Sequence, residues 1–266
     1  MKEFDQLVEI MAALRGPGGC PWDHEQTIDT LKPFVLEETY EVLDAIDRHD
    51  HEALCEELGD FVFEAVFLAQ IESEQGHFTI ADSLGRIAAK LVRRHPHVFA
   101  RNPGDAPVDS AGQVRTRWEA IKAQERGTES ARTLLSGIAP ALPALLRAYH
   151  IGVRAASVGF DWPATRDVVG KIEEEVNELE EVVGAGGEID SGRAEEEMGD
   201  LLFSIANLSR KLGIEPETAL RKANEKFTRR FTAMERGVAE SGRTVAELSL
   251  EELEAAWQNV KTQRFE

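Results

Sequence analysis

Hydrophobic residues recur at intervals of three and four along most of the chain, which is the spacing of one face of an α-helix. In residues 2–15 these positions are Phe4, Leu7, Val8, Met11 and Leu14. The pattern stops at Gly and Pro residues and resumes after them, and it predicts further helices over residues 33–48, 52–75, 79–94, 113–126, 165–183, 193–212 and 215–240, with a last one around Trp257. We expect Pro33 in the first turn of its helix, where proline is tolerated. Few β-branched runs occur, so the sequence predicts an all-α fold.

The second half of the chain repeats the order of features in the first half. Matched residues are separated by 136 to 140 positions, and the pairs are Trp22 and Trp162, Glu38 and Glu175, Glu57 and Glu197, Lys90 and Lys226, and Trp118 and Trp257. A nearly constant offset at five landmarks indicates a duplicated domain. Residues 127–133 are polar and unpatterned. We therefore expect tandem helical bundles over residues 1–127 and 134–266.

Each copy carries two pairs of acidic residues, and the members of a pair are three positions apart, so they share a helix face. Within a copy, 15 or 18 residues separate the two pairs, which suits a helix–turn–helix hairpin that turns both pairs towards each other. The pairs are Glu38 and Glu41 with Glu57 and Asp60 in the first copy, and Glu175 and Glu178 with Glu197 and Asp200 in the second.

A single acidic pair is better interpreted as part of a solvated surface. These four-carboxylate sets are instead interpreted as metal ligands. Asp60 and Asp200 lead directly into hydrophobic runs, so the acids lie at the edge of a core. Two like charges about 4 Å apart repel by about 4 kcal/mol at an effective dielectric constant of about 20, so four converging carboxylates need a cation. Because the expected ligands are all oxygen atoms, the cation is magnesium, with manganese as an alternative. Magnesium shares its ligand shell with phosphates, which points to a polyphosphate substrate.

Basic residues of the second copy are candidates for binding that substrate. Lys171 and Arg193 each precede an acidic residue by one helical turn, and Lys226 and Arg230 are also one turn apart. Each alone is equally consistent with an ordinary ion pair, but the set favours phosphate binding. Trp257 is more simply a core anchor, and it stacks on the nucleobase only if its helix closes over the site.

The first copy lacks half of this basic set. Phe34 and Ala53 occupy the positions of Lys171 and Arg193. We therefore expect the first copy to keep its metal ligands but to be weak or inactive.

The amino-acid composition and net charge limit the classes of binding partner that we expect. Hydrophobic residues make up 42% of the chain, which is enough for a core, and the formal net charge is -19. A nucleic-acid or anionic-membrane partner would need a basic surface, so we expect neither. The two cysteines, Cys20 and Cys55, imply no disulfide framework, and no stretch reads as a signal sequence or a membrane span. We expect a cytoplasmic protein.

The acidic pairs and their flanking motifs resemble those of the MazG nucleoside triphosphate pyrophosphohydrolases. The stretches that carry the resemblance are Leu36-Glu37-Glu38-Thr39-Tyr40-Glu41, Glu57-Leu58-Gly59-Asp60, Arg93-Arg94-His95-Pro96-His97-Val98-Phe99 and Val158-Gly159-Phe160-Asp161-Trp162. They look like the two-domain bacterial form over nearly the whole length. The resemblance implies an all-α homodimer that hydrolyses nucleoside triphosphates to the monophosphate and pyrophosphate with magnesium and loose base selectivity. It also implies that the C-terminal copy is the active one.

The expected catalytic residues are therefore Glu175, Glu178, Glu197 and Asp200, around magnesium that activates water for attack on the α-phosphorus. Glu175 is a candidate for assisting the removal of the water's proton. The basic residues would offset the charge on the phosphates and on the leaving pyrophosphate.

Two other classes of function stay open at this point. The chain would be a non-catalytic nucleotide-binding regulator if it binds without cleaving, or a helical partner-binding scaffold if its acids are only surface. Within the enzymes, a relative specific for one nucleotide, such as dUTP or phosphoribosyl-ATP, is a further alternative.

Overall fold

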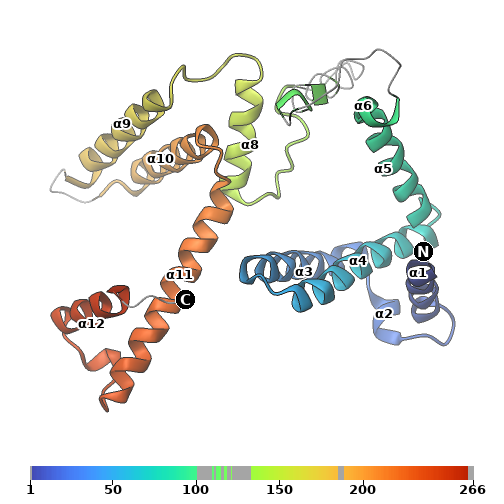
Figure 1. The fold of residues 1–266 in the computed structure, drawn as a ribbon, viewed down its shortest axis with the longest axis horizontal. Helices are drawn as coiled ribbons and strands as arrows, with labels where there is room; N and C mark the ends of the chain where they lie inside the picture. The colour runs from blue at the N-terminus through green and yellow to red at the C-terminus, as the bar shows by residue number, and fades with distance from the viewer. Residues whose placement is uncertain are drawn as a thin grey trace. The chain divides into compact units, whose positions relative to one another are not determined.

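The described part of the chain is helical throughout. The structure, a computed structural model, describes residues 2–100, 110, 112–114, 117–118, 121, 133–184 and 189–262. It divides into two compact units, residues 1–128 and 129–266, and no strand occurs among the described residues of either unit (Figure 1). The predicted all-α class is confirmed, and two helical units in tandem agree with the repeat.

The first unit is organised around a helical hairpin. Its helices are α1 (Lys2–Arg15), α2 (Pro21–Glu25), α3 (Ile28–Arg48), α4 (His51–Glu74), α5 (Ile80–Arg94) and α6 (Pro96–Phe99). α3 and α4 pack along each other, and α1 packs against α4. Between α3 and α4 the chain reverses at His49, which has φ 56°, and Asp50 then caps α4 through the backbone N–H of Ala53. The core of this unit is Met11, Leu31, Val66, Phe67 and Ile71.

α3 begins earlier than the sequence pattern predicted. Thr27 and Thr30 form a reciprocal capping box, which starts the helix at Ile28 and leaves Pro33 inside it. The expectation that Pro33 lies in the first turn is wrong, because this polar cap, and not the proline, sets the start.

The second unit contains a matching hairpin. Its elements are α8 (Ala144–Ala156), α9 (Thr165–Gly184), α10 (Ser191–Lys211), α11 (Pro216–Glu240), the short 3₁₀ helix η1 (Val245–Glu247) and α12 (Leu250–Thr262). α9 and α10 pack along each other, α8 packs against α10, and α12 packs against α11. Asp190 caps α10 by accepting the backbone N–H groups of Gly192 and Arg193.

One described helix of the second unit departs from the sequence prediction. The helix α8 was not predicted, and it meets α10 closely at Gly152, where an added Cβ would lie 2.7 Å from Asn207 Oδ1. The helix predicted over residues 113–126 falls almost entirely outside the described residues. No described helix is long and apolar enough to cross a membrane.

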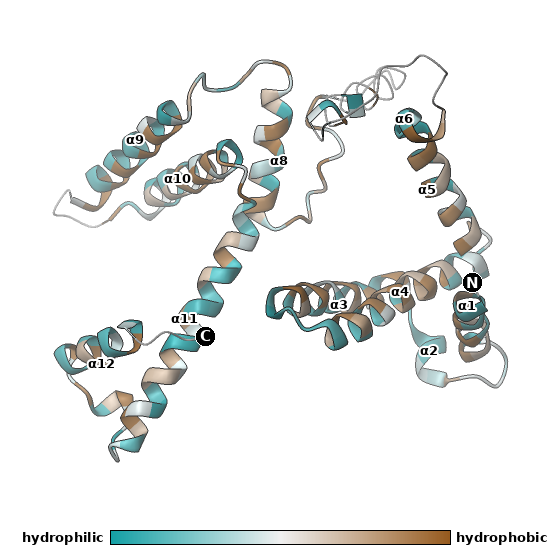
Figure 2. Ribbon diagram, in the orientation of Figure 1, coloured by the Kyte–Doolittle hydropathy of each residue, from teal (hydrophilic) through white to brown (hydrophobic). Residues whose placement is uncertain are grey.

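Hydrophobic residues remain exposed on the helices of each hairpin and on α5 (Figure 2). On α4 these are Leu58, Phe61 and Val62, and on α10 they include Met198, Leu202 and Ile205. Their spacing of three or four places each set on one side of its helix. Within each unit as described, this side has no covering element.

Candidate metal centre and active site

The second hairpin brings together three of the four predicted carboxylates of its copy. Glu175 and Glu178 come from α9 and Glu197 comes from α10, and one carboxylate oxygen from each lies within 4.8 Å of the others. Glu175 is only 2% exposed, and the other two are half-buried. Three oxygen donors at this separation suit a hard divalent cation.

The first hairpin makes the same arrangement. Glu38 and Glu41 of α3 and Glu57 of α4 also place carboxylate oxygens within 4.8 Å of one another. One oxygen of Glu38, Oε2, is buried and has no hydrogen-bond partner. A buried carboxylate oxygen without a donor is the kind of atom that a cation would satisfy.

The two aspartates lie at the edge of these groups. Asp60 and Asp200 are both exposed and belong to neither three-carboxylate group. Asp60 is nevertheless near enough to Glu38 to help raise the pKa of that carboxyl group. Each aspartate follows its clustered glutamate by three positions and so faces the same side of the helix.

Burial and mutual repulsion both raise the pKa of clustered acids. Burial, and then the neighbouring carboxylates, raise the pKa of Glu38 and of Glu57 in the first copy. Burial, then Glu197 and Glu175, raise the pKa of Glu178 in the second. A raised pKa means that these sites hold negative charge at a cost, which a bound cation would remove.

Two of the predicted basic residues reach the second acidic group. Lys171 Nζ lies 2.6 Å from Glu175 Oε1 and 2.8 Å from Glu174 Oε1, and these two carboxylates raise the pKa of the lysine. Arg193 Nε lies 3.7 Å from Glu197 Oε1. The second copy thus has positive charge directly beside its carboxylates.

The other predicted substrate residues lie on α11 and α12. Lys226 is exposed, Arg230 is half-buried, and the Trp257 ring packs 5.1 Å from the ring of Phe227. The described contacts do not join these three residues to Glu175, Glu178 and Glu197. Figure 1 shows α12 folded against α11, at a distance from the hairpin of α9 and α10.

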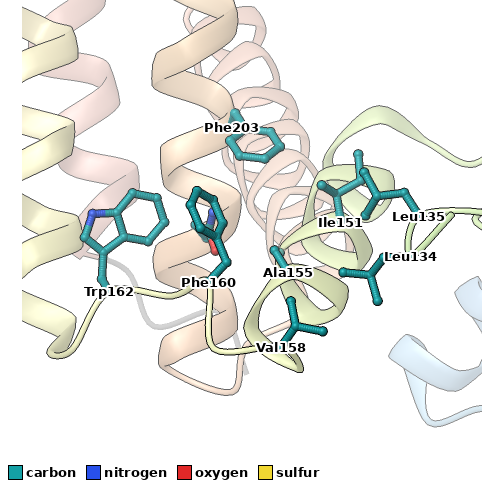
Figure 3. A pocket seen from close by; sticks show the side chains of 10 residues that line it. Leu134, Leu135, Ile151, Ala155, Val158, Phe160, Trp162 and Phe203 are labelled. Atoms are coloured by element: carbon teal, nitrogen blue, oxygen red, sulfur yellow. The ribbon is translucent and has the colours of Figure 1, made fainter. Parts of the chain in front are cut away.

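A hydrophobic cavity of about 410 Å³ opens beside α10 in the second unit. Figure 3 shows Phe160, Trp162 and Phe203 around one part of it, and Leu134, Leu135 and Ile151 around another. Asn207 contributes an amide to the lining. Phe160 is 81% exposed, so its side chain is available at the mouth of this cavity and is not part of the core.

Asp161, between the cavity residues Phe160 and Trp162, links its loop to the end of α10 through ion pairs. Its carboxylate accepts hydrogen bonds from Arg210 Nη2 at 2.5 Å and from Lys211 Nζ at 2.7 Å. Although burial opposes it, these two cations lower the pKa of Asp161.

One carboxylate of the first copy was not predicted from the sequence. Glu64 lies on α4 beyond Asp60, is only 7% exposed, and faces Glu38 and Asp60. Its spacing was the available signal, because Glu57, Asp60 and Glu64 follow the i, i+3, i+7 pattern of one helix face. The hydrophobic residues around it hid that signal.

Comparison with known proteins places both hairpins in one family. The model of the MazG nucleotide pyrophosphohydrolase domain matches the chain twice, over residues 26–99 and 166–233. A nucleoside triphosphate pyrophosphohydrolase of Escherichia coli (strain K12) is 48% identical over 267 residues, covering 100% of both chains. The nucleoside triphosphate pyrophosphohydrolase/pyrophosphatase MazG of Thermotoga maritima is 46% identical over 97% of this chain and 95% of its own length. The chain is therefore an enzyme of the MazG nucleotide pyrophosphohydrolase family, with two copies of the family's domain.

Proposed function

We propose that the C-terminal copy of this chain hydrolyses nucleoside triphosphates, ribose or deoxyribose, to the monophosphate and pyrophosphate with magnesium. The observation that carries the proposal is the meeting of Glu175, Glu178 and Glu197 with Lys171 and Arg193 beside them. Carboxylates with neighbouring cations suit a metal-bound polyphosphate better than either charge alone. The activity named for the full-length relatives supports the same reaction.

Magnesium would be held by Glu175, Glu178 and Glu197, with Asp200 joining from the next turn of α10, and it would supply Lewis-acid activation of water and phosphate. Manganese would serve the same site. The reaction joins a water oxygen to the α-phosphorus and breaks the bond from that phosphorus to the bridging oxygen, which leaves with pyrophosphate.

The side chains have distinct tasks in this proposal. Glu175 is engaged by Lys171 at 2.6 Å, so Glu178, for which the described residues offer no ion pair, is the better placed to take the water's proton. This reassigns the proton acceptor that the sequence analysis placed at Glu175. Lys171 and Arg193 can turn from their carboxylates to the phosphates and offset the charge that develops on pyrophosphate.

Lys226, Arg230 and Trp257 are proposed to complete the substrate site from α11 and α12. This role requires movement of those helices towards α9 and α10, or a contribution from a second chain. Lys226, which is exposed, and Arg230, which is half-buried, lie one helical turn apart on α11.

We propose that the chain works as a homodimer in the cytoplasm. Both hairpins expose hydrophobic residues on one side, including Phe61 on α4 and Leu202 on α10. Such faces are typical of protein interfaces, and two copies of one chain would cover them symmetrically. Molar mass from light scattering would test this, because a monomer at micromolar concentration would contradict it.

The activity is tested by pyrophosphate release from a panel of nucleoside triphosphates, beginning with ATP and dATP, with and without magnesium. Glu197→Gln removes one cluster carboxylate and should lower the rate by at least about 10³-fold while the helical circular dichroism stays unchanged. Glu180→Gln, an exposed glutamate on α9, is the matched control. An active Glu197→Gln enzyme would contradict the assignment, and nucleotide binding without pyrophosphate release by the unmodified chain would indicate a regulator.

The first copy is proposed to contribute little turnover, because Phe34 and Ala53 replace the two cations of the second. Glu57→Gln in the first copy should therefore leave at least about half of the pyrophosphate release. A loss as large as that from Glu197→Gln would show that the two copies share one activity.

A further inference from the structure

The first copy holds a fifth acidic side chain that the second copy lacks. Glu64 is 7% exposed, and its Oε2 atom is buried with no hydrogen-bond partner, as is Oε2 of Glu38. Both atoms belong to the same corner of the hairpin, because Glu64 interacts electrostatically with Glu38 and with Asp60. The first hairpin thus buries two carboxylate oxygens that have no hydrogen-bond donor, one on each of its two helices.

Nothing described around this corner neutralises it. The charged groups that act on Glu64 are Glu38 and Asp60, and the charged groups that act on Glu38 are likewise all acidic. An unpaired buried charge costs several kcal/mol in a protein interior. Since the described neighbours supply no cation, the missing partner is one that comes from solution.

The second copy is built differently at the matching position. The offset of 140 that relates Glu57 to Glu197 relates Glu64 to Ser204, a buried residue that is neutral. The second group also has Lys171 and Arg193 as ion-pair partners, where the first has Phe34 and Ala53. The first copy therefore gathers more negative charge and less positive charge than the second.

We propose that Glu64 is a metal ligand, and that the N-terminal copy is a dedicated divalent-cation site that fills without nucleotide. Glu38, Glu41 and Glu57 supply the outer oxygens, and Glu64 supplies one from the core side. A cation held by four or five carboxylates has fewer open positions for phosphate oxygens. The first copy then serves as a metal-stabilised partner of the catalytic copy, which goes beyond the proposed hydrolysis and does not depend on it.

The alternative is that Glu64 keeps its proton and donates a hydrogen bond to Glu38. Glutamine has the same shape as a protonated glutamate and can donate in the same way, but it is a poor ligand for a hard cation. Glu64→Gln therefore separates the two roles. Glu52→Gln, an exposed glutamate on the same helix, makes the same change of charge away from the site.

The experiment uses the full chain with Glu178→Gln and Glu197→Gln, so that the second group no longer competes for metal. Mn²⁺ alone is titrated without nucleotide, and the free ion is followed by electron paramagnetic resonance. The background protein should bind one Mn²⁺ per chain, and addition of Glu64→Gln should raise the Kd at least about tenfold, since loss of even an indirect contact costs that much. Addition of Glu52→Gln should leave the Kd within about twofold.

A second readout is the increase in Tm that Mn²⁺ causes. An ion that binds only the folded chain stabilises that state and so raises the Tm. That shift should shrink with Glu64→Gln, and Glu64→Ser, which copies the second unit, should behave in the same way. Equal Mn²⁺ affinity with and without Glu64→Gln would overturn the proposal in favour of the retained proton. Absence of Mn²⁺ binding to the background protein would also overturn it, whatever the enzyme's pyrophosphate release shows.

Discussion

Asp161 illustrates what a single carboxylate does for the second unit. It accepts hydrogen bonds from Arg210 and Lys211, and all three side chains are at most 21% exposed. Asp161→Asn would leave two largely buried cations without their counter-charge, so we expect the free energy of unfolding to fall by about 3 kcal/mol. Urea denaturation followed by circular dichroism measures this, with Glu180→Gln as an exposed acid-to-amide control. A loss below about 0.5 kcal/mol would show that the pair contributes no more than a surface ion pair.

Glu64 predicts a pH dependence for the metal-free protein. Its folded-state pKa of about 6 lies above the ordinary value of 4.5, because it is buried next to Glu38 and Asp60. Below pH about 4.5 the group is protonated in both states, and as the pH rises towards 6 the unfolded chain loses the proton first. Stability should therefore decrease by up to about 2 kcal/mol across this window.

Chemical denaturation between pH 4.5 and 7 in the presence of EDTA measures this decrease. The same series on Glu64→Gln should lack the contribution of this group, and the difference between the two curves isolates it from other titrations. Parallel curves would contradict a raised pKa at Glu64.

Among the elements, α8 and α9 carry glycines with opposite surroundings. A Cβ on Gly152 of α8 would lie 2.7 Å from Asn207 Oδ1 and 3.1 Å from Arg210 Nε, whereas a Cβ on Gly170 of α9 would meet nothing within 4 Å. We expect Gly152→Ala to destabilise the fold by about 1–3 kcal/mol because α8 must move away from α10. Gly170→Ala should instead stabilise it by about 0.5–1 kcal/mol, since alanine restricts the unfolded chain and favours helix.

Gly152→Ala and Gly170→Ala serve as controls for each other, because the chemical change is identical in two helices of one unit. Midpoints of urea unfolding for the two variants should lie on opposite sides of the unmodified protein. Equal shifts in the same direction would mean that the approach of α8 to α10 at Gly152 is not tight in solution.

The elements also show where sequence reasoning succeeds and where it ends. The hairpins were predictable because amphipathic spacing, intervening length and paired acids all agree at Glu38–Asp60 and at Glu175–Asp200. α8 was missed because Gly152 interrupts its pattern and lowers its helix propensity, and the need for this glycine is apparent only from its close approach to Asn207. The start of α3 was misplaced because Pro33 outweighed the capping box at Thr27 in the prediction.

The sequence predicted that acidic residues of the two hairpin helices meet, but not which other charged groups surround them. The sequence could align Lys171 with Glu175, because they are four apart on one helix. Spacing alone could not show that Glu64 is buried against Glu38, since this depends on how α3 packs on α4. Local periodicity thus shows which acidic residues share a face of one helix, and the contribution of the facing helix emerges only from packing.

For the molecule as a whole, duplication has produced two hairpins that each gather acidic side chains but differ in the charges around them. The first keeps an extra buried carboxylate at Glu64, and the second carries Lys171 and Arg193 at 2.6 Å and 3.7 Å from its acids. In a chain with a net charge of -19, local cations of this kind are needed to hold an anionic substrate. We therefore expect metal binding and nucleotide binding to respond differently when a cation is removed.

Lys171→Met tests this division in the full chain. Loss of the ammonium group should lower kcat/KM for a nucleoside triphosphate by about 10²-fold, because it removes charge that offsets the phosphates. The same change should leave Mn²⁺ binding to the second group unchanged or tighter, since Glu175 no longer has a competing positive partner at 2.6 Å. Lys32→Met, which removes an exposed lysine that pairs with Asp29 in the first copy, is the matched control. If Lys171→Met weakened Mn²⁺ binding and nucleotide turnover together, the lysine would be a structural support for Glu175 and not a phosphate ligand.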